Sequence, residues 1–338
     1  MEERKKYKIV KDKHLMRSWK GKNYYPIQAL IDIPEYKVHA RDLGGFVESE
    51  KNLSQKGTCW IAHYGFVIGN ARVYEDAFVD FYGEVKDNAK VHGHARIKTD
   101  SSIRENAEIY GRAQIHIAMI GGNAKIYEYA EVHCMSENRQ YQCIEGNCRI
   151  HGHARVSPFA RISGEADVCG HASVHSDAIV SGKARIDGEA VIHEYAEVSD
   201  NAHVGGNATV YKMAKVLGNA DVTGNVEVAV AAKVSGNAEL SGSVFVHETV
   251  SVGGNAKVTQ GRLARDWFGG GAPPPYWVAT WGHPSLGLVC FMSNTGGICS
   301  NCDEEVKEKD SHMPLCCPGC GLMIEEIIKA PRYRPETY

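Results

Sequence analysis

Apolar and polar residues alternate in triplets that recur every six residues from Cys148 to Val258. Each triplet holds a small residue, one outward residue and one aliphatic residue. All nineteen aliphatic positions of this stretch are Ile, Val or Leu, and fifteen of the nineteen small positions are Ala. Alternation is the period of a β-strand, in which neighbouring side chains point to opposite faces. The pattern therefore predicts a series of very short strands, each with one buried face.

Pairs of turn-forming residues separate the triplets, as Gly218 and Asn219 do. Gly, Asn and Asp tolerate the left-handed backbone of a tight corner, so the chain is expected to turn every six residues. Three strands and three corners close a coil of eighteen residues, and successive coils stack at a strand spacing of about 4.8 Å. The predicted fold is all-β, a single-stranded parallel β-helix.

The same period extends towards the N-terminus with two irregularities. Ile115 and Ile126 are eleven residues apart instead of twelve, which places a missing residue near 119–122. Val132 and Ile150 are eighteen apart and are expected to bound one full but imperfect coil. Weaker apolar signals suggest that the coils begin near residue 45, which gives about twelve coils in all.

Four parts follow from where the period starts and stops. A solenoid exposes unpaired strand edges at its ends, so the first residues are expected to form a cap with short strands at 8–10 and 28–33. The pattern ends after Val258, and a run of Gly and Pro follows. The predicted parts are an N-terminal β cap over 1–43, the β-helix over 44–260, a linker and aromatic segment over 261–298, and a zinc ribbon over 299–338.

The zinc ribbon is predicted from two Cys-x-x-Cys pairs separated by fourteen residues. Two such pairs can place four thiolates tetrahedrally around one zinc ion, and a site without an open position is structural. Cys316 adjoins the second pair and could replace Cys317. The expected ligands of this structural zinc are Cys299, Cys302, Cys317 and Cys320.

Composition and net charge limit the kinds of molecule that the chain is expected to bind. With 338 residues, a net charge of −3 and 43% hydrophobic residues, the chain can bury a long core and has no global charge that would recruit nucleic acid or a membrane. Residues 1–22 are basic, which keeps nucleic acid as a less favoured partner, although a solvated basic face explains them as well. Eleven cysteines and a charged N-terminus favour a cytoplasmic location.

The outward faces are predicted to be polar. One face, read every eighteen residues, alternates in charge and is expected to be solvated and self-compensating; it holds Glu131, Arg149, Asp167, Arg185, His203, Asp221, Glu239 and Lys257. On the other two faces only Ile179, Val191 and Phe245 are large and apolar, too few for an extensive dry interface. Monomer and homotrimer both remain open.

Histidines gather at the corners, where coil arithmetic stacks them. The eighteen-residue spacing places His133 below His151 and Cys169, and it also pairs His153 with His171 and His175 with His193. His and Cys at this spacing could hold a metal ion or position a general base, so these residues form a candidate pocket. The alternative is that corner positions face solvent and accept any polar residue.

These hexads resemble the hexapeptide-repeat, left-handed β-helix family, best known for acyltransferases that use an acyl-CoA or acyl-carrier donor. Residues 42–48 (DLGGFVE) and 52–55 (NLSQ) are similar to the start of YdcK-like proteins, a bacterial group labelled as acyltransferases. The resemblance covers about residues 24–258 and implies the left hand of the helix. It also implies acetyl-CoA or another acyl-CoA as a donor if the protein is an enzyme, and trimers are typical of the family's acyltransferases.

Two functions follow. The first is a binding or structural scaffold that presents repetitive polar faces and a zinc-ribbon contact module to a protein or small-molecule partner. The alternative is an O- or N-acyltransferase of the hexapeptide-repeat type, in which His151 or His153 takes the proton of the acceptor. The hexads point to no family position for a catalytic His, so the sequence leaves enzyme activity open.

Overall fold

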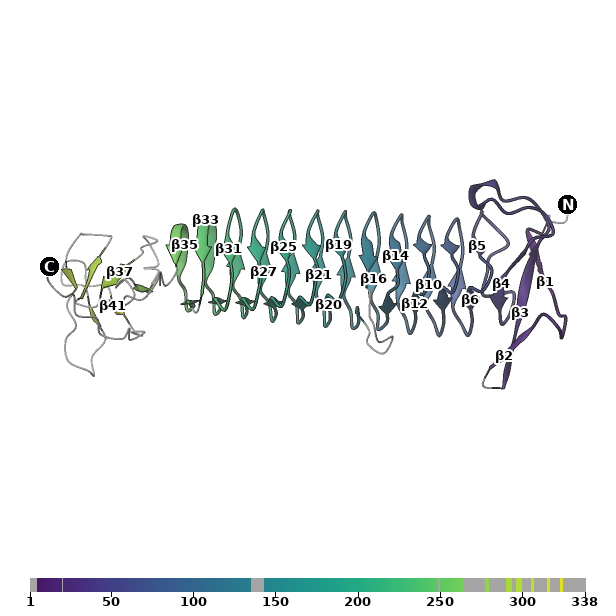
Figure 1. Ribbon diagram of the computed structural model, residues 1–338, viewed down its shortest axis with the longest axis horizontal. Helices are drawn as coiled ribbons and strands as arrows, with labels where there is room; N and C mark the ends of the chain where they lie inside the picture. Colours follow the sequence, from purple (N-terminus) through teal and green to yellow (C-terminus); the bar gives the residue numbers. More distant parts are fainter. Residues whose placement is uncertain are drawn as a thin grey trace, which may run out of the picture. The chain divides into compact units, whose positions relative to one another are not determined.

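The computed structural model describes residues 5–19, 21–134, 143–248 and 250–263, and six short strands, without their side chains, between 277 and 324. The chain is all-β: among these residues the helical element is one short 3-10 turn, η1 (Pro34–Tyr36). Parallel strands stack coil on coil within each of two units, 1–188 and 189–338 (Figure 1). The coils number about twelve, which confirms the predicted β-solenoid.

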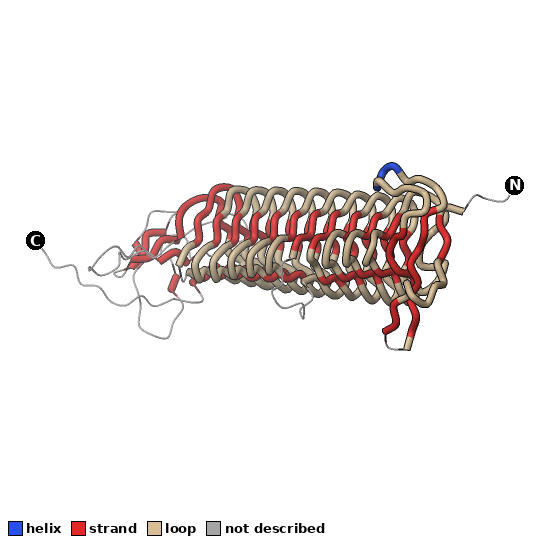
Figure 2. Tube along the Cα trace, turned by 45° about the vertical axis from the view of Figure 1, so that its right-hand side comes forward, coloured by secondary structure: helices blue, strands red, loops and turns tan. Residues whose placement is uncertain are grey.

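Three columns of parallel strands form the coils of the first unit (Figure 2). The first column holds β7 (Arg72–Val73), β10 (Lys90–Val91), β13 (Glu108–Ile109), β16 (Lys125–Ile126), β18 (Arg149–Ile150), β21 (Asp167–Val168) and β24 (Arg185–Ile186). The second holds β5 (Trp60–Ile61), β8 (Phe78–Val79), β11 (Arg96–Ile97), β14 (Gln114–His116), β17 (Glu131–His133), β19 (Arg155–Val156) and β22 (Ser173–Val174). The third holds β4 (Leu43–Val47), β6 (Phe66–Val67), β9 (Glu84–Val85), β12 (Ser102–Ile103), β15 (Met119–Ile120), β20 (Arg161–Ile162) and β23 (Ile179–Val180).

The second unit repeats the three columns. One column holds β27 (His203–Val204), β30 (Asp221–Val222), β33 (Glu239–Val246) and β35 (Lys257–Leu263). Another holds β25 (Val191–Ile192), β28 (Thr209–Val210), β31 (Glu227–Val228) and the end of β33. The last holds β26 (Glu197–Val198), β29 (Lys215–Val216), β32 (Lys233–Val234) and β34 (Ser251–Val252). Further strands are β36 (Trp277–Ala279), β37 (Cys290–Ser293), β38 (Gly296–Cys299), β39 (Glu305–Val306), β40 (Leu315–Cys316) and β41 (Met323–Ile324).

The interior of each coil is filled by the small and aliphatic residues of the triplets. Ile150, Val168 and Val198 are fully buried, as are the alanines two residues before Val168 and Val198. The residue between them points outward, so nearly every two-residue strand reads outward and then inward. Each buried aliphatic side chain contributes about 1.5–3 kcal/mol, and the stack has one at every strand. This alternation carries the stability of the coils.

Many corner residues with left-handed backbone are glycines, and some others are acidic residues whose carboxylate binds the next coil. In the first unit Glu128 has a φ of 59°, and its carboxylate accepts a hydrogen bond from the Gly152 N–H at 2.8 Å. In the second unit Asp200, at φ 61°, accepts the Gly218 N–H at 2.9 Å. A charge-assisted hydrogen bond of this kind offsets the cost of about 1–2 kcal/mol of placing a side chain in this region.

Asparagines beside the corners form amide ladders. Each Nδ2 donates to the Oδ1 of the asparagine in the next coil at 2.8–3.1 Å, through Asn70, Asn88, Asn106, Asn123 and Asn147 in the first unit. Asn201, Asn219, Asn237 and Asn255 repeat the ladder in the second unit. Turn propensity predicted these asparagines, and the ladder gives them a second role, since each amide satisfies its neighbour.

The two irregularities of the period resolve differently from the prediction. Ser102 already pairs with Met119, seventeen residues later, so the missing residue lies before Met119 and not within 119–122. Lys125 pairs with Arg149, twenty-four residues later, so Val132 and Ile150 do not bound one standard coil. Val132 lies beside Val156 instead. Six extra residues leave the inward and outward alternation unchanged, which is why the pattern alone did not show them.

The longer register corrects the predicted charged face. Glu131 pairs with Arg155 in the second column, where the two side chains form an ion pair at 3.7 Å. Lys125 takes the place that the prediction gave to Glu131, beside Arg149. Asp167, predicted to be solvated, is 7% exposed. The face therefore keeps its polarity but contains one deeply placed carboxylate.

The first residues form an antiparallel sheet that continues into the coils. β1 (Tyr7–Ile9) and β2 (Arg17–Trp19) pair with β3 (Lys22–Ala29), and β3 pairs with β4, the first strand of the third column. The strand predicted at 8–10 is therefore present one residue earlier. The strand predicted at 28–33 was placed too late, because the segment that pairs ends at Ala29. No helix among the described residues has the length and apolar character to cross a membrane.

Lys6 departs from the predicted solvated basic face. Its side chain is 2% exposed, and its Nζ donates to the carbonyls of Lys56 and Gly57 and to the Cys59 Sγ at 3.1 to 3.4 Å. Burial raises the pKa of the Cys59 thiol, and the Lys6 ammonium opposes that rise. Lys6 thus fastens β1 to the first coil.

Replacing Lys6 with Met should destabilise this attachment by about 1–3 kcal/mol, because three acceptors lose their buried donor. Hydrogen exchange of the β1 amides would measure the loss, with Lys8→Met as the control, since Lys8 is exposed. Equal exchange in the two variants would show that Lys6 does not anchor the strand.

Candidate functional site

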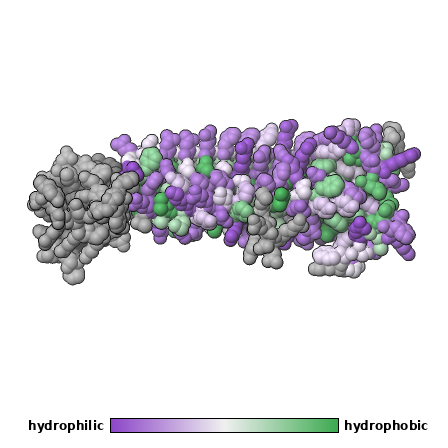
Figure 3. Space-filling model, in the orientation of Figure 1, coloured by the Kyte–Doolittle hydropathy of each residue, from purple (hydrophilic) through white to green (hydrophobic). Residues whose placement is uncertain are grey.

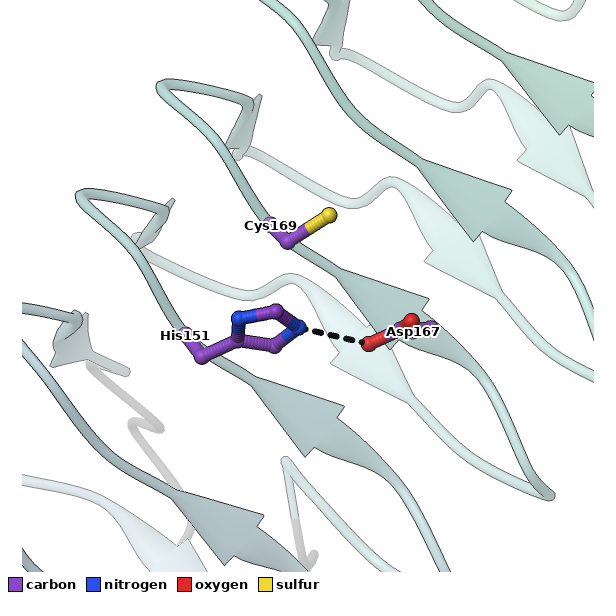
Figure 4. A group of neighbouring side chains, drawn as sticks. All are labelled: His151, Asp167 and Cys169. Atoms are coloured by element: carbon purple, nitrogen blue, oxygen red, sulfur yellow. Dashed lines mark hydrogen bonds and ion pairs between the residues drawn. The ribbon is translucent and has the colours of Figure 1, made fainter.

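Three side chains with metal-ligating or catalytic chemistry meet on two adjacent coils of the first unit. His151 follows β18, whereas Asp167 begins β21 and Cys169 follows it (Figure 4). The strands pair with Ile150 beside Val168, so His151 and Cys169 share one corner and Asp167 lies diagonally from His151. One donor atom from each of the three residues lies within 4.8 Å of the others.

Asp167 is the centre of this cluster. Its Oδ1 lies 3.1 Å from His151 Nε2, and its Oδ2 lies 3.0 Å from a guanidinium nitrogen of Arg149. Arg185, from the next coil, lies 3.8 Å from the same Oδ2. A buried carboxylate needs such partners, because an unpaired buried charge is costly. Asp167 therefore orients the imidazole and is held by two cations.

His151 is fixed on its ring face as well. The ring stacks on Tyr127 of the preceding coil, with centroids 4.7 Å apart and planes within 3°. Its Nδ1 lies 3.8 Å from Glu128 Oε2. If Nε2–H donates to Asp167, the lone pair of the neutral ring is on Nδ1. This is the arrangement of a histidine base whose tautomer is set by a carboxylate.

The thiol of Cys169 is 7% exposed and lies 3.9 Å from Arg185 Nη2. Burial raises its pKa, and the negative Asp167 adds to the rise, whereas Arg185 acts against it. Imidazole, carboxylate and thiolate together suit a borderline divalent cation such as zinc. The Asp167 carboxylate, however, is already paired with the guanidinium groups of Arg149 and Arg185. The protonated thiol of Cys169 would also have to lose its proton to bind a metal ion. The donor set therefore fits an oriented histidine better than a metal ion.

The stack below His151 extends through several coils of the first unit. Ring centroids lie 4.5–5.1 Å apart and the planes stay within 7° of parallel along Tyr74, His92, Tyr110, Tyr127 and His151. The seventeen-residue and twenty-four-residue registers hide this column from an eighteen-residue count. Tyr127 was missed for that reason. Arg149, Asp167 and Arg185 were found in the sequence only as members of a charged face.

The predicted candidate pocket divides between several corners. His133 does not stack below His151, because the longer register pairs its strand with β19; His133 lies beside His116, with ring centroids 5.5 Å apart. His153 and His171 stack as the spacing predicts, with centroids 4.9 Å apart. These two rings lie on a different corner position from His151, above Tyr129.

The remaining predicted histidines, His175 and His193, are each described within their own unit, and their stacking stays a prediction. His175 lies in the first unit, where its Nδ1 is 3.2 Å from Ser176 Oγ. His193 lies in the second unit and stacks on Tyr211 at 5.1 Å, and burial lowers its pKa. The predicted zinc ligands Cys299, Cys302, Cys317 and Cys320 lie outside the residues whose side chains are described.

His116 supplies a pH-dependent prediction. Burial lowers its pKa, the neighbouring Lys98 and His133 lower it further, and Glu131 and Asp80 act in the opposite direction. The unfolded chain, with an ordinary histidine pKa of about 6.5, therefore binds the proton first as the pH falls. Stability should be full above about pH 6.5 and should decrease from there towards pH 5.

Replacing His116 with Gln should flatten this part of the stability curve. Urea titrations between pH 7 and pH 5 would measure it, with exposed His14→Gln as the control variant. An unchanged slope in His116→Gln would assign the dependence to other groups.

The chain was compared with models of protein families and with curated proteins, and none of them matches it.

Proposed function

We propose that the protein is a β-solenoid scaffold that binds a protein partner through its charged outer faces, with the C-terminal cysteine-rich segment as a zinc-dependent contact module. The observation that carries the proposal is the ionic pairing of outward residues from coil to coil. In the first unit Glu108 lies 3.9 Å from both Lys90 and Lys125. In the second unit Lys215 lies 2.6 Å from Glu197 and Lys257 lies 2.8 Å from Glu239.

These pairs explain little of the stability. Exposed ion pairs contribute about 0.2–1 kcal/mol each, whereas the buried aliphatic residues contribute several times more. A regular array of charges, repeated at the strand spacing of about 4.8 Å, is a surface that a partner with complementary charges can recognise in one register. The view in Figure 3 shows a face covered mainly by hydrophilic residues. Ile179 and Phe245 are single exposed apolar side chains, and the exposed rings of Phe81 and Tyr82 form a small group with Tyr64. This apolar exposure is too small for an extensive dry interface.

The zinc module is supported by the spacing of its two Cys-x-x-Cys pairs. A site of this kind folds only with its metal, so zinc content is a direct test. Purified full-length protein should contain one zinc ion per chain by plasma mass spectrometry, and Cys302→Ser should lose it. Cys169→Ala is the control, because it removes a donor of the coil cluster. Loss of zinc in the control but not in Cys302→Ser would move the metal to His151 and Asp167 and would contradict the proposed module.

Partner binding is tested by capture with cross-linking, followed by measured affinity for the recovered protein. Lys215→Glu with Lys233→Glu reverses the charge of two stacked residues of one face, and binding should weaken at least tenfold and fall with added salt. Ile179→Ala, also outward, is the matched control and should bind as the wild type does. Equal affinity in all variants at every salt concentration would exclude the faces as the binding surface.

Acyl transfer is the second candidate function, and one observation favours it: His151 is oriented by Asp167 as a general base requires. The described contacts of His153 are ring stacks and a backbone N–H bond to Gly170, so the geometry favours His151 of the two predicted bases. His151→Ala should abolish transfer from acetyl-CoA to a hydroxyl or amine acceptor, whereas His153→Ala should retain it. Absence of acetyl-CoA binding in the wild type, measured by calorimetry, would remove this candidate.

A further inference from the structure

Two cysteines flank the segment that lengthens one coil of the first unit. Cys134 follows β17, and Cys143 precedes Ile144, which bridges β15 and β20. Both are free thiols and both are buried, at 3% and 8% exposure. Eight residues, 135–142, separate them in the sequence. They belong neither to the charged faces nor to the cluster around Asp167.

The backbone brings the two cysteines onto the same corner of the underlying coil. The Cys134 N–H donates to the His116 carbonyl at 3.2 Å, and the Cys143 N–H donates to the Met119 carbonyl at 3.1 Å. His116 and Met119 end and begin two consecutive strands, β14 and β15. The thiols of the two cysteines form a hydrogen bond with each other. Two hydrogen-bonded thiols, each on a residue held by its own backbone hydrogen bond, are neighbours that oxidation can join as a disulfide.

The two thiols are not equivalent. Cys143 accepts the hydrogen bond from the Cys134 thiol, which lowers its pKa despite its burial. While Cys143 is protonated, its Sγ donates to the Met119 carbonyl at 3.3 Å, and this bond is given up when the thiolate forms. Donating that bond, together with burial, raises the pKa of Cys134. Thiolates, not thiols, attack electrophiles, so Cys143 is the nucleophile and Cys134 the resolving residue.

We propose that Cys134 and Cys143 are a thiol–disulfide site that hydrogen peroxide oxidises and a dithiol reductant restores. The Cys143 thiolate attacks one peroxide oxygen, the O–O bond breaks, and the leaving hydroxide takes a proton to become water. The sulfenic acid on Cys143 is then attacked by the Cys134 sulfur, which forms the S–S bond and releases a second water. Two thiols and one peroxide thus give one disulfide and two waters.

The cross-link would fix the ends of the segment that creates the twenty-four-residue register. It joins the end of β17 to the start of the bridge at Ile144, so the spacing between these two points becomes covalent. The site therefore adds a redox-dependent modification to the solenoid, and it stands independently of the proposed scaffold function.

The experiment is peptide mapping of the full-length protein after peroxide treatment, blocking of free thiols, and trypsin digestion. Arg139 separates the two cysteines, so a disulfide joins two tryptic peptides, 126–139 and 140–149. Cys148 lies in the second peptide, and the map is made in a Cys148→Ala background to remove the ambiguity. Ala suits that position because most of the small positions are Ala.

Most of the treated molecules should carry the linked peptide pair, and dithiothreitol should separate it. Buried Cys59, whose pKa is raised, should remain a thiol and serves as the internal control. Cys134→Ser should give Cys143 that is trapped as a sulfenic acid by dimedone, with no linked pair. Cys143→Ser should leave Cys134 reduced. Linked peptides that pair Cys134 or Cys143 with another cysteine, or two free thiols after oxidation of Cys59, would overturn the proposal.

Discussion

Ile150→Ala should lower the free energy of unfolding by about 2–5 kcal/mol, the range measured when a large buried aliphatic side chain is truncated. Ile150 is fully buried between β16 and β21, where it lies beside Ile126 and Val168. The coil is narrow and its backbone is hydrogen-bonded to both neighbours, so it cannot collapse to fill the space. A cavity term therefore adds to the lost transfer free energy.

Ile179→Ala is the matched control for this prediction. The same side chain is removed, but Ile179 occupies the outward position of β23 and is 36% exposed. Its truncation should cost less than about 1 kcal/mol, as for most surface substitutions. Urea denaturation followed by circular dichroism would compare the two variants, with equal m-values required, since stacked repeats can unfold in parts. Equal losses would contradict the alternation of inward and outward residues on which the coils are built.

The architecture was predictable because the repeat is nearly free of exceptions. A period of six with a small and an aliphatic residue two apart leaves few alternatives to short strands that turn at fixed intervals. Val47, Leu53, Ile61 and Val67, the weakest of the predicted positions, are all buried at 1% exposure or less. Burial depends on alternation, which is local, so the pattern predicts it without knowledge of the register.

The pairing register depends on the number of residues in each coil. That number could not be read from the sequence where a coil is one residue shorter or six residues longer than the standard eighteen. Val132 and Ile150 are separated by one coil's worth of residues, yet Ile150 pairs with Ile126. An insertion of six residues is one full triplet and corner, so it imitates a regular repeat. The pairing of Cys143 and Ile144 with Met119 through backbone hydrogen bonds shows where the coil resumes.

The candidate site was predictable in part for the same reason. Cys169 lies one regular coil after His151, and eighteen-residue counting brings the two to one corner. His133 was wrongly added because the count crosses the insertion. Asp167 reaches His151 diagonally, sixteen residues away in the sequence. Counting along columns cannot show a diagonal contact, because it depends on the direction in which each side chain leans.

Gly164→Ala should destabilise the protein by about 2–4 kcal/mol in total, from backbone strain and from a steric clash. Gly164 has a φ of +74°, where an L side chain costs about 1–2 kcal/mol. An added Cβ would also lie 2.6 Å from the Gly182 carbonyl oxygen and 2.9 Å from its nitrogen. These are backbone atoms of the next coil, so relief requires two stacked corners to separate.

Gly21→Ala isolates the strain from the clash. Gly21 has the same φ of +74°, but an added Cβ would meet no atom within 4 Å. We expect a loss of only about 1–2 kcal/mol there, so the difference between the two variants measures the contact between stacked corners. Urea denaturation at neutral pH gives both values. A difference near zero would mean that the corners of adjacent coils yield easily, and the close backbone stacking that excludes side chains at Gly164 would no longer explain why glycine occupies it.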